Sequence, residues 1–240
     1  MAALVDASSP IRWSGTPADG VDITSASFTA PADALLVVCA SLDGNSGAGA
    51  IVATCSDSGG LTWTTKVSRE NNETVAGGAS FIFTARTTSA VARTVGVRRT
   101  SDGGTNRISA KCYVVTGADV DGTPVDSVGA SNEGGSATNN LDTTNVTPGA
   151  TGLLFVAECD WSALGYTASS NLTQDTAIYA GAISAFSGYR TCASGVGVSG
   201  NIDSDTGTPQ HKWCQIVVRE APGAAPYVAG RGFAVQQRMG

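Results

Sequence analysis

The sequence predicts an all-β protein, an antiparallel β-sandwich or jelly roll with an extended arm at each end. Thr and Val are plentiful while Met occurs only twice, and no stretch repeats its apolar residues at the 3.6-residue period of a helix. Short candidate strands return about every ten residues, with Gly, Asn, Asp or Ser between them, which is typical of sandwiches. The chain also contains a faint internal repeat.

The repeat pairs residues 28–38 (FTAPADALLVV) with residues 146–156 (VTPGATGLLFV). Three shorter matches follow in the same order: 61–63 with 172–174, 81–87 with 185–191, and 112–115 with 214–217. This order favours two pseudo-repeated β halves, about 21–120 and 121–220. The alternative, that β-rich segments share a turn, a proline and an apolar run by composition alone, stays open.

The expected elements begin after an N-terminal arm, residues 1–20, in which Trp13 is the one anchor. We expect this arm to lie on a surface without forming an element of its own. The expected strands are 21–29, 34–42, 50–55, 61–68, 79–86, 91–99, 107–116, 124–130, 138–147, 152–160, 171–178, 182–190, 193–199 and 212–219.

Residues 34–40 and 153–157 are apolar at consecutive positions, so both faces of these strands should be buried at the centre of packed sheets. By contrast, residues 61–67 and 94–98 alternate, which predicts one buried and one wet face. From residue 221 the composition changes. Pro222 and Pro226 cannot extend a central strand, so residues 221–240 are expected to form a C-terminal arm anchored by Tyr227 and Phe233.

Composition limits the partners that we expect. At 240 residues the chain could form one large β domain or two small ones. Charged residues make up 14% of the chain and the formal net charge is −6, so we expect no nucleic-acid partner. The basic residues near Arg98 and Arg99 are expected to decorate a solvated strand edge. No run reaches the ~18 apolar residues of a membrane span, and the N-terminus lacks an export signal, which predicts synthesis in the cytoplasm and no membrane partner.

The six cysteines favour buried structural thiols, although three disulfides stay open as the alternative. No spacing of Cys and His predicts a metal site. Asp119–Gly122 and Asp203–Gly207 resemble calcium-loop fragments, but neither has the distal Glu, so plain turns are expected. We expect no cofactor.

Candidate catalytic groups are few. The single histidine, His211, stands at the start of an expected strand, and no GxSxG motif accompanies it. Glu158 and Asp160 are two apart on one strand and therefore share a face, as a glycosidase carboxylate pair could. The favoured alternative is solvated turn chemistry at a strand end. We expect a protein that is not an enzyme.

Three segments resemble virion proteins of tailed bacteriophages: Ser56–Thr64 (SDSGGLTWT), Val114–Asp119 (VVTGAD) and Thr147–Val156 (TPGATGLLFV). Those proteins are similarly rich in Gly, Ala and Thr and poor in His, and are commonly minor tail or capsid decoration proteins. The resemblance spans about residues 20–220 and brings no catalytic residues. It implies a β-sandwich displayed on a virion in a symmetric homo-oligomer, with terminal arms bearing Trp13, Tyr227 and Phe233 that contact other capsid or tail proteins.

Two further hypotheses are kept beside this one. A carbohydrate- or host-surface-binding module would present exposed aromatic side chains, for which Trp161 and Tyr166, in a loop after a core strand, are the best candidates. A glycan hydrolase would use Glu158 and Asp160.

Overall fold

The protein is described by a computed structural model covering residues 2–43, 51–69, 78–100, 107–134, 140–160, 171–179, 183–203 and 210–223. These residues form 18 β-strands and no helix, which confirms the all-β class and is consistent with a β-sandwich. Within them, no helix is long and apolar enough to cross a membrane.

The first sheet has six antiparallel strands in the order β1-β11-β5-β8-β7, and β2 also pairs with β11. Its strands are β1 (Leu4–Val5), β2 (Trp13–Gly15), β5 (Leu35–Asp43), β7 (Thr64–Arg69), β8 (Gly78–Arg86) and β11 (Ile108–Thr116). The N-terminal residues thus lie on the first sheet and add two short strands to its edge, beside β11. Their strands are two and three residues long, too short to produce a recognisable alternation.

The second sheet has five antiparallel strands in the order β12-β18-β14-β16-β15. They are β12 (Val125–Gly134), β14 (Gly152–Asp160), β15 (Thr173–Tyr179), β16 (Ile183–Cys192) and β18 (Gln210–Arg219).

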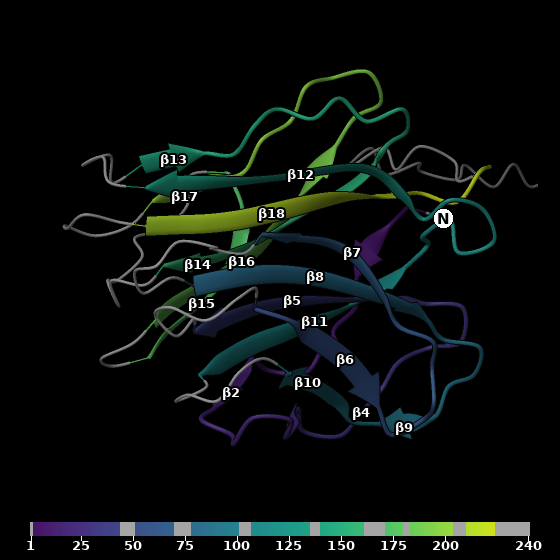
Figure 1. Cartoon of the computed structure of the whole chain (residues 1–240). Helices are drawn as coiled ribbons and strands as arrows, with labels where there is room; N and C mark the ends of the chain where they lie inside the picture. Colours follow the sequence, from purple (N-terminus) through teal and green to yellow (C-terminus); the bar gives the residue numbers. More distant parts are fainter. Residues whose placement is uncertain are drawn as a thin grey trace, which may run out of the picture.

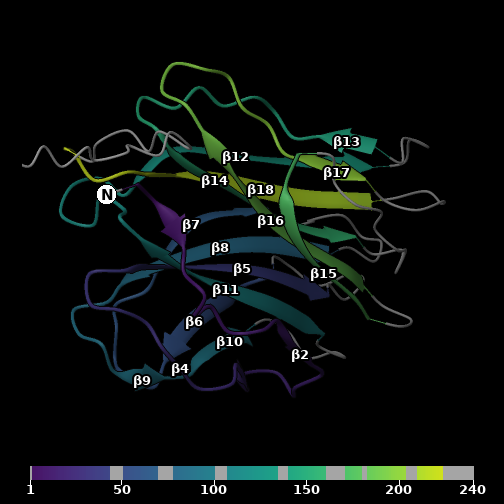
Figure 2. The same ribbon diagram turned by 180° about the vertical axis from the view of Figure 1, so that it is seen from behind.

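Three small sheets complete the fold. They pair β3 (Ile23–Thr24) and β6 (Ala53–Asp57) with β10 (Val95–Arg99), β13 (Asn140–Asp142) with β17 (Asn201–Asp203), and β4 (Phe28–Thr29) with β9 (Ala92–Arg93). Figures 1 and 2 show the two large sheets stacked on each other, with β6 and β10 below the first sheet and β13 and β17 above the second. Residues 91–99 divide into β9 and β10 because these strands pair with different partners. Residues 193–199 contain only a bridge from Val198 to Val146.

The two central strands, β5 and β14, are buried along their whole length, as their consecutive apolar residues predict. Alternate residues of β5 belong to different cores. Leu36 and Val38 pack with Val95 and other residues of the outer small sheet. Leu35 and Val37 pack with residues of the second sheet in an inter-sheet core whose large members include Ile82, Tyr113, Phe155 and Ile216.

The two large sheets arrange their strands in the same order relative to the chain: β11-β5-β8-β7 in the first and β18-β14-β16-β15 in the second. The register differs from two matches of the sequence repeat. Phe81 lies opposite Ala40 and Phe186 lies opposite Glu158, so Phe186 and not Ala185 takes the place of Phe81. Lys111 lies opposite Cys39 and Cys214 lies opposite Ala157, so Cys214 takes the place of Lys111 and not of Cys112. A shift of one residue changes the face of a strand. Common descent of the halves stays a prediction.

Phe155 provides a test of the inter-sheet core, because its ring lies 5.3 Å from that of Tyr113 and is completely buried. We expect Phe155→Ala to lower the free energy of unfolding by about 3–5 kcal/mol through lost burial and a residual cavity. Chemical denaturation would measure this. The control is Val128→Ala on β12, whose side chain is 53% exposed and whose effect should stay within about 0.5 kcal/mol. Equal effects of the two variants would contradict the assigned core.

Candidate functional site

A group of polar side chains lies where the first sheet meets β15 and β16 of the second. We call it the seam cluster: Arg12, Ser109, Lys111, Tyr113, Asp175 and Ser187. Arg12 stands between β1 and β2, which both pair with β11. This double attachment holds the Arg12 segment against the first sheet, from which the guanidinium reaches the second.

Arg12 uses its guanidinium nitrogens across this junction. Nε lies 2.6 Å from Asp175 Oδ1, and Nη2 donates to the backbone oxygen of Asp175 at 2.6 Å and also to Ser187 Oγ. Nη1 donates to Ser109 Oγ at 3.2 Å. Because the planar guanidinium presents fixed donors, these contacts define the position of β15 relative to the first sheet.

Lys111 provides the second cation beside Asp175. Its Nζ lies 3.0 Å from Asp175 Oδ2 and 5.7 Å from the centre of the Tyr113 ring, within range of a cation–π contact. Burial by itself would raise the pKa of Asp175, but Arg12 and Lys111 together outweigh it and hold this pKa below its usual value. Asp175 is therefore ionised at neutral pH.

Tyr113 and Tyr189 form the aromatic wall of the cluster. The Tyr113 hydroxyl lies 2.8 Å from Ser187 Oγ, and its ring meets that of Tyr189 edge to face at 5.5 Å. Burial raises the pKa of Tyr113 well above its usual value, so the phenol stays neutral.

A pocket of about 210 Å³ opens beside these groups. Its lining consists of Val5, Ser9, Lys111, Tyr113, Thr173, Gln174, Asp175 and Tyr189. No sequence pattern predicts this pocket, because its residues come from strands and segments far apart in the chain. The one local signal is Lys111, the single charged residue of β11.

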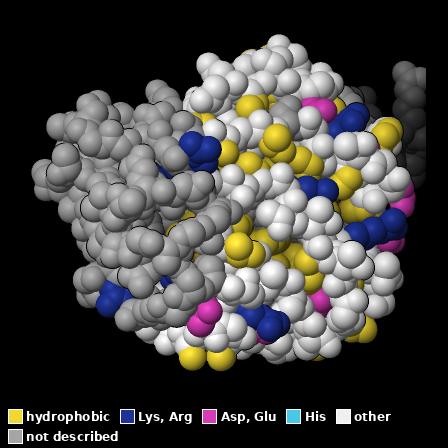
Figure 3. Space-filling view, in the orientation of Figure 1, with side chains coloured by type: hydrophobic (Ala, Val, Ile, Leu, Met, Phe, Trp, Pro, Cys, Tyr) yellow, Lys and Arg dark blue, Asp and Glu magenta, His cyan; other side chains and the backbone are white. Residues whose placement is uncertain are grey.

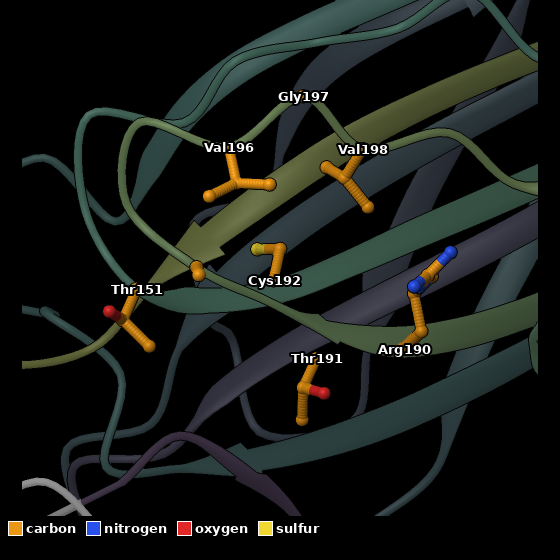
Figure 4. A pocket seen from close by; sticks show the side chains of 8 residues that line it. Thr151, Arg190, Thr191, Cys192, Val196, Gly197 and Val198 are labelled. Carbon is orange, nitrogen blue, oxygen red and sulfur yellow. The ribbon is translucent and has the colours of Figure 1, made fainter.

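A second and larger pocket, of about 420 Å³, lies at the end of β16 (Figure 4). Arg190, Cys192, Val196 and Val198 are among its lining residues. Burial raises the pKa of the Cys192 thiol to about 11, so this cysteine is protonated at neutral pH and is a poor nucleophile. The Arg190 side chain donates to the backbone oxygen of Ser199 at 3.4 Å.

The aromatic residues singled out from the sequence have different outcomes. Trp13 is 8% exposed and packs in the core of the first half, and its Nε1 donates to the backbone oxygen of Ile23 at 3.3 Å. Trp161, Tyr166, Tyr227 and Phe233 lie outside the described residues. Their proposed roles stay predictions.

Glu158 and Asp160 are completely buried, so the expectation of solvated turn residues is wrong. Both belong to the outer face of β14, which they share with Leu154 and Val156 by strand alternation. Asp160 lies opposite His211 in the register of β14 and β18. A catalytic role for the two carboxylates stays a prediction.

The arginines near residue 98 are also placed differently from the expectation of a solvated edge. Arg93 is buried and lies 3.1 Å from Asp57 Oδ2, while Asp57 Oδ1 accepts from the Leu61 amide and from Trp63 Nε1. Arg99 is buried too, and donates to the backbone oxygen of Asp43. Arg98, which is half-buried, pairs with Asp22 at 3.1 Å. These contacts tie loops to strands.

The two calcium-loop fragments have different outcomes. Asp119 Oδ1 accepts from the Gly122 amide at 3.1 Å, which is ordinary turn chemistry. Asp205 lies outside the described residues. In the described part of the chain, no group of three or more His, Cys, Asp or Glu side chains could hold a metal ion.

Comparison with known proteins adds no assignment: no family model, no curated protein and no solved structure matches this chain.

Asp175→Asn tests the seam cluster. At pH 7 we expect a loss of about 1.5–3 kcal/mol in the free energy of unfolding, the contribution of hydrogen bonds to charged groups. Because the pKa of Asp175 is lowered in the folded state, this contribution is present above the ordinary pKa of Asp and is lost as the pH falls through the folded-state value.

The difference between wild type and variant should therefore shrink in denaturation curves recorded below about pH 4. The control is Asp121→Asn, which removes the exposed partner of Arg86 and should change stability little. A wild-type advantage that persists unchanged in acid would contradict the ionised role of Asp175.

The cysteines give a second test, because all six are free. Burial raises the pKa of Cys214 to about 12 and raises the pKa of Cys39 and Cys159 well above the usual value. We expect iodoacetamide at pH 8 to label none of these three in the native protein and all of them in denaturant, as read by peptide mass spectrometry. Native labelling of Cys39 would show that the inter-sheet core opens.

Proposed function

We propose that this chain is a structural protein of a tailed-bacteriophage virion, displayed on the capsid as a decoration protein or forming part of the tail or a fibre. It is not an enzyme and acts through protein–protein contacts, in a homo-oligomer attached to other virion proteins. The sequence resemblance motivates this proposal, and the placement of apolar side chains on the N-terminal segment carries it.

The N-terminal segment, residues 4–21, is fixed to the first sheet through β1 and β2. It nevertheless presents apolar side chains to solvent. Leu4 is 51% exposed, Ile11 77% and Val21 50%. Arg12 and Trp13, next to Ile11, are buried by contacts within the chain. A segment that is held rigidly while its apolar residues face outward suits docking, because little conformational entropy is lost on contact.

Both ends of the described chain lie at the same pole of the first sheet. Leu4 pairs with Thr116, and the Ala221 amide donates to the backbone oxygen of Gly117 at 2.9 Å. Figure 1 shows the N-terminus beside the end of β18. Residues 224–240, which include Tyr227 and Phe233 of the proposed C-terminal arm, lie outside the described residues.

The distribution of charge on the surface favours contact with proteins and does not favour attraction to a polyanion. In the described part of the face drawn in Figure 3, basic and acidic side chains lie in small groups of both signs among polar and apolar atoms. Arg86, for example, pairs with both Asp33 and Asp121. With a net charge of −6, such a surface favours broad contacts with other virion proteins and gives no steering toward nucleic acid.

The sharpest test is Ile11→Asp. Because the side chain is mostly exposed, the variant should fold normally. Its attachment to undecorated particles, or its self-association, should weaken about tenfold or more, since charge would replace an apolar contact worth about 1.4 kcal/mol. Light scattering of the protein alone and mixed with particles would measure both.

The matched control is Val91→Asp, which changes an apolar side chain that is 44% exposed outside the N-terminal segment. Deletion of residues 222–240 should likewise leave the thermal transition intact and abolish attachment. Normal assembly of both the Ile11 variant and the deletion would contradict the proposal.

A further inference from the structure

The pocket of about 210 Å³ beside the seam cluster, which we call the seam pocket, has the features of a ligand site. The proposed assembly function does not require such a site. We propose that the seam pocket binds one ring of a sugar acid, with Lys111 holding the carboxylate of the ligand. This proposal does not depend on the virion assignment, because the group that would hold the ligand, Lys111, is not among the exposed apolar residues of the N-terminal segment.

The charges of the seam cluster favour an anion. Arg12 and Lys111 bring two positive charges and Asp175 one negative charge, so the cluster has an excess of one positive charge. Arg12 is occupied by Asp175, Ser109 and Ser187. Lys111 has three N–H donors, and within the described part of the chain Asp175 takes one of them.

The position of Lys111 makes this charge effective. Its side chain is only 13% exposed and it lines the pocket, so an ion pair formed there is screened by water less than one on the open surface. The contact with the Tyr113 ring and the ion pair with Asp175 hold the ammonium in place. A carboxylate entering the pocket would thus meet a donor that is already positioned.

The lining and the size favour a sugar ring. Thr173, on the same face of β15 as Asp175, brings a hydroxyl, and Tyr189 brings an aromatic ring that is partly exposed. Hydroxyl groups need such polar partners, while the C–H face of a sugar packs on an aromatic ring. At about 210 Å³, the pocket is smaller than the ~300–1,000 Å³ that drug-sized ligands occupy, which fits a single ring.

The pocket is also rigid, because its walls stand on paired strands. Lys111 and Tyr113 lie on β11 between β5 and the N-terminal strands, and Tyr189 lies on β16 between β14 and β15. Arg12 fixes β15 to the first sheet through Asp175. The site is therefore formed before a ligand arrives.

The test is titration of the full-length protein with sodium glucuronate, followed by chemical-shift changes of backbone amides, with glucose and inorganic phosphate as comparison ligands. We expect saturable shifts at residues of the pocket with glucuronate, and at least about tenfold weaker binding of glucose and of phosphate, which lack the carboxylate and the ring respectively.

Two variants locate the binding. Lys111→Gln removes the charge and should weaken glucuronate binding about tenfold while leaving the weak glucose response unchanged. Thr173→Asp, which leaves Lys111 in place, adds a negative charge on the face of β15 that lines the pocket and should weaken glucuronate binding similarly. The matched control, Lys66→Gln on β7 at the opposite edge of the first sheet, should bind as the wild type does.

Amide spectra in the absence of ligand would verify that each variant is folded. If Lys111→Gln fails to fold, Thr173→Asp decides the outcome by itself. The proposal is overturned if wild-type protein shows no saturable shifts with glucuronate, if phosphate binds as tightly as glucuronate, or if folded variants at both positions keep wild-type affinity.

Discussion

The fold depends on the packing of the two large sheets through the inter-sheet core. Each sheet has a central strand that is buried on both faces, so neither sheet could remain in water by itself without exposing a continuous apolar surface. The approach is close at Gly78, where a Cβ atom would collide with the Sγ atom of Cys159 on the second sheet. A glycine is required there because a strand of one sheet lies directly against a side chain of the other.

The polar groups at the junction follow from this packing. Near their edges the sheets meet at the seam cluster and not at the apolar core. There the carboxylate of Asp175 pairs with the cations of Arg12 and Lys111. Arg12 donates to the backbone oxygen of Asp175 and thereby occupies a polar group of the edge strand β15. Edge strands with uncovered backbone groups invite pairing with other chains. The same contact thus fixes the sheets, covers part of an edge and holds in place Asp175, which lines the pocket.

The two proposals concern different parts of the molecule. The N-terminal segment contacts the first sheet on one side and presents Ile11 and its apolar neighbours on the other, which suits attachment to proteins. The pocket lies between the sheets and has a single partly buried ammonium group, which suits a small anion. A virion protein that also binds a sugar acid could contact a host surface. The two activities would be separable by single substitutions, because Ile11 does not line the pocket and Lys111 is not an exposed apolar residue.

The sequence alone determined the strand class and the two buried central strands, because period and apolar runs are local properties of consecutive residues. Residues 152–160 were expected as a strand and form β14 with those bounds. What only the tertiary structure decided depends on residues distant in the chain. Glu158 and Asp160, which were expected at a solvated strand end, are buried. Arg93 pairs with Asp57, which is 36 residues away in the chain. Likewise Arg12 and Asp175 are 163 residues apart and form an ion pair because the sheets stack. The local sequence pattern contains no information about which side chains the stacking of two sheets brings together.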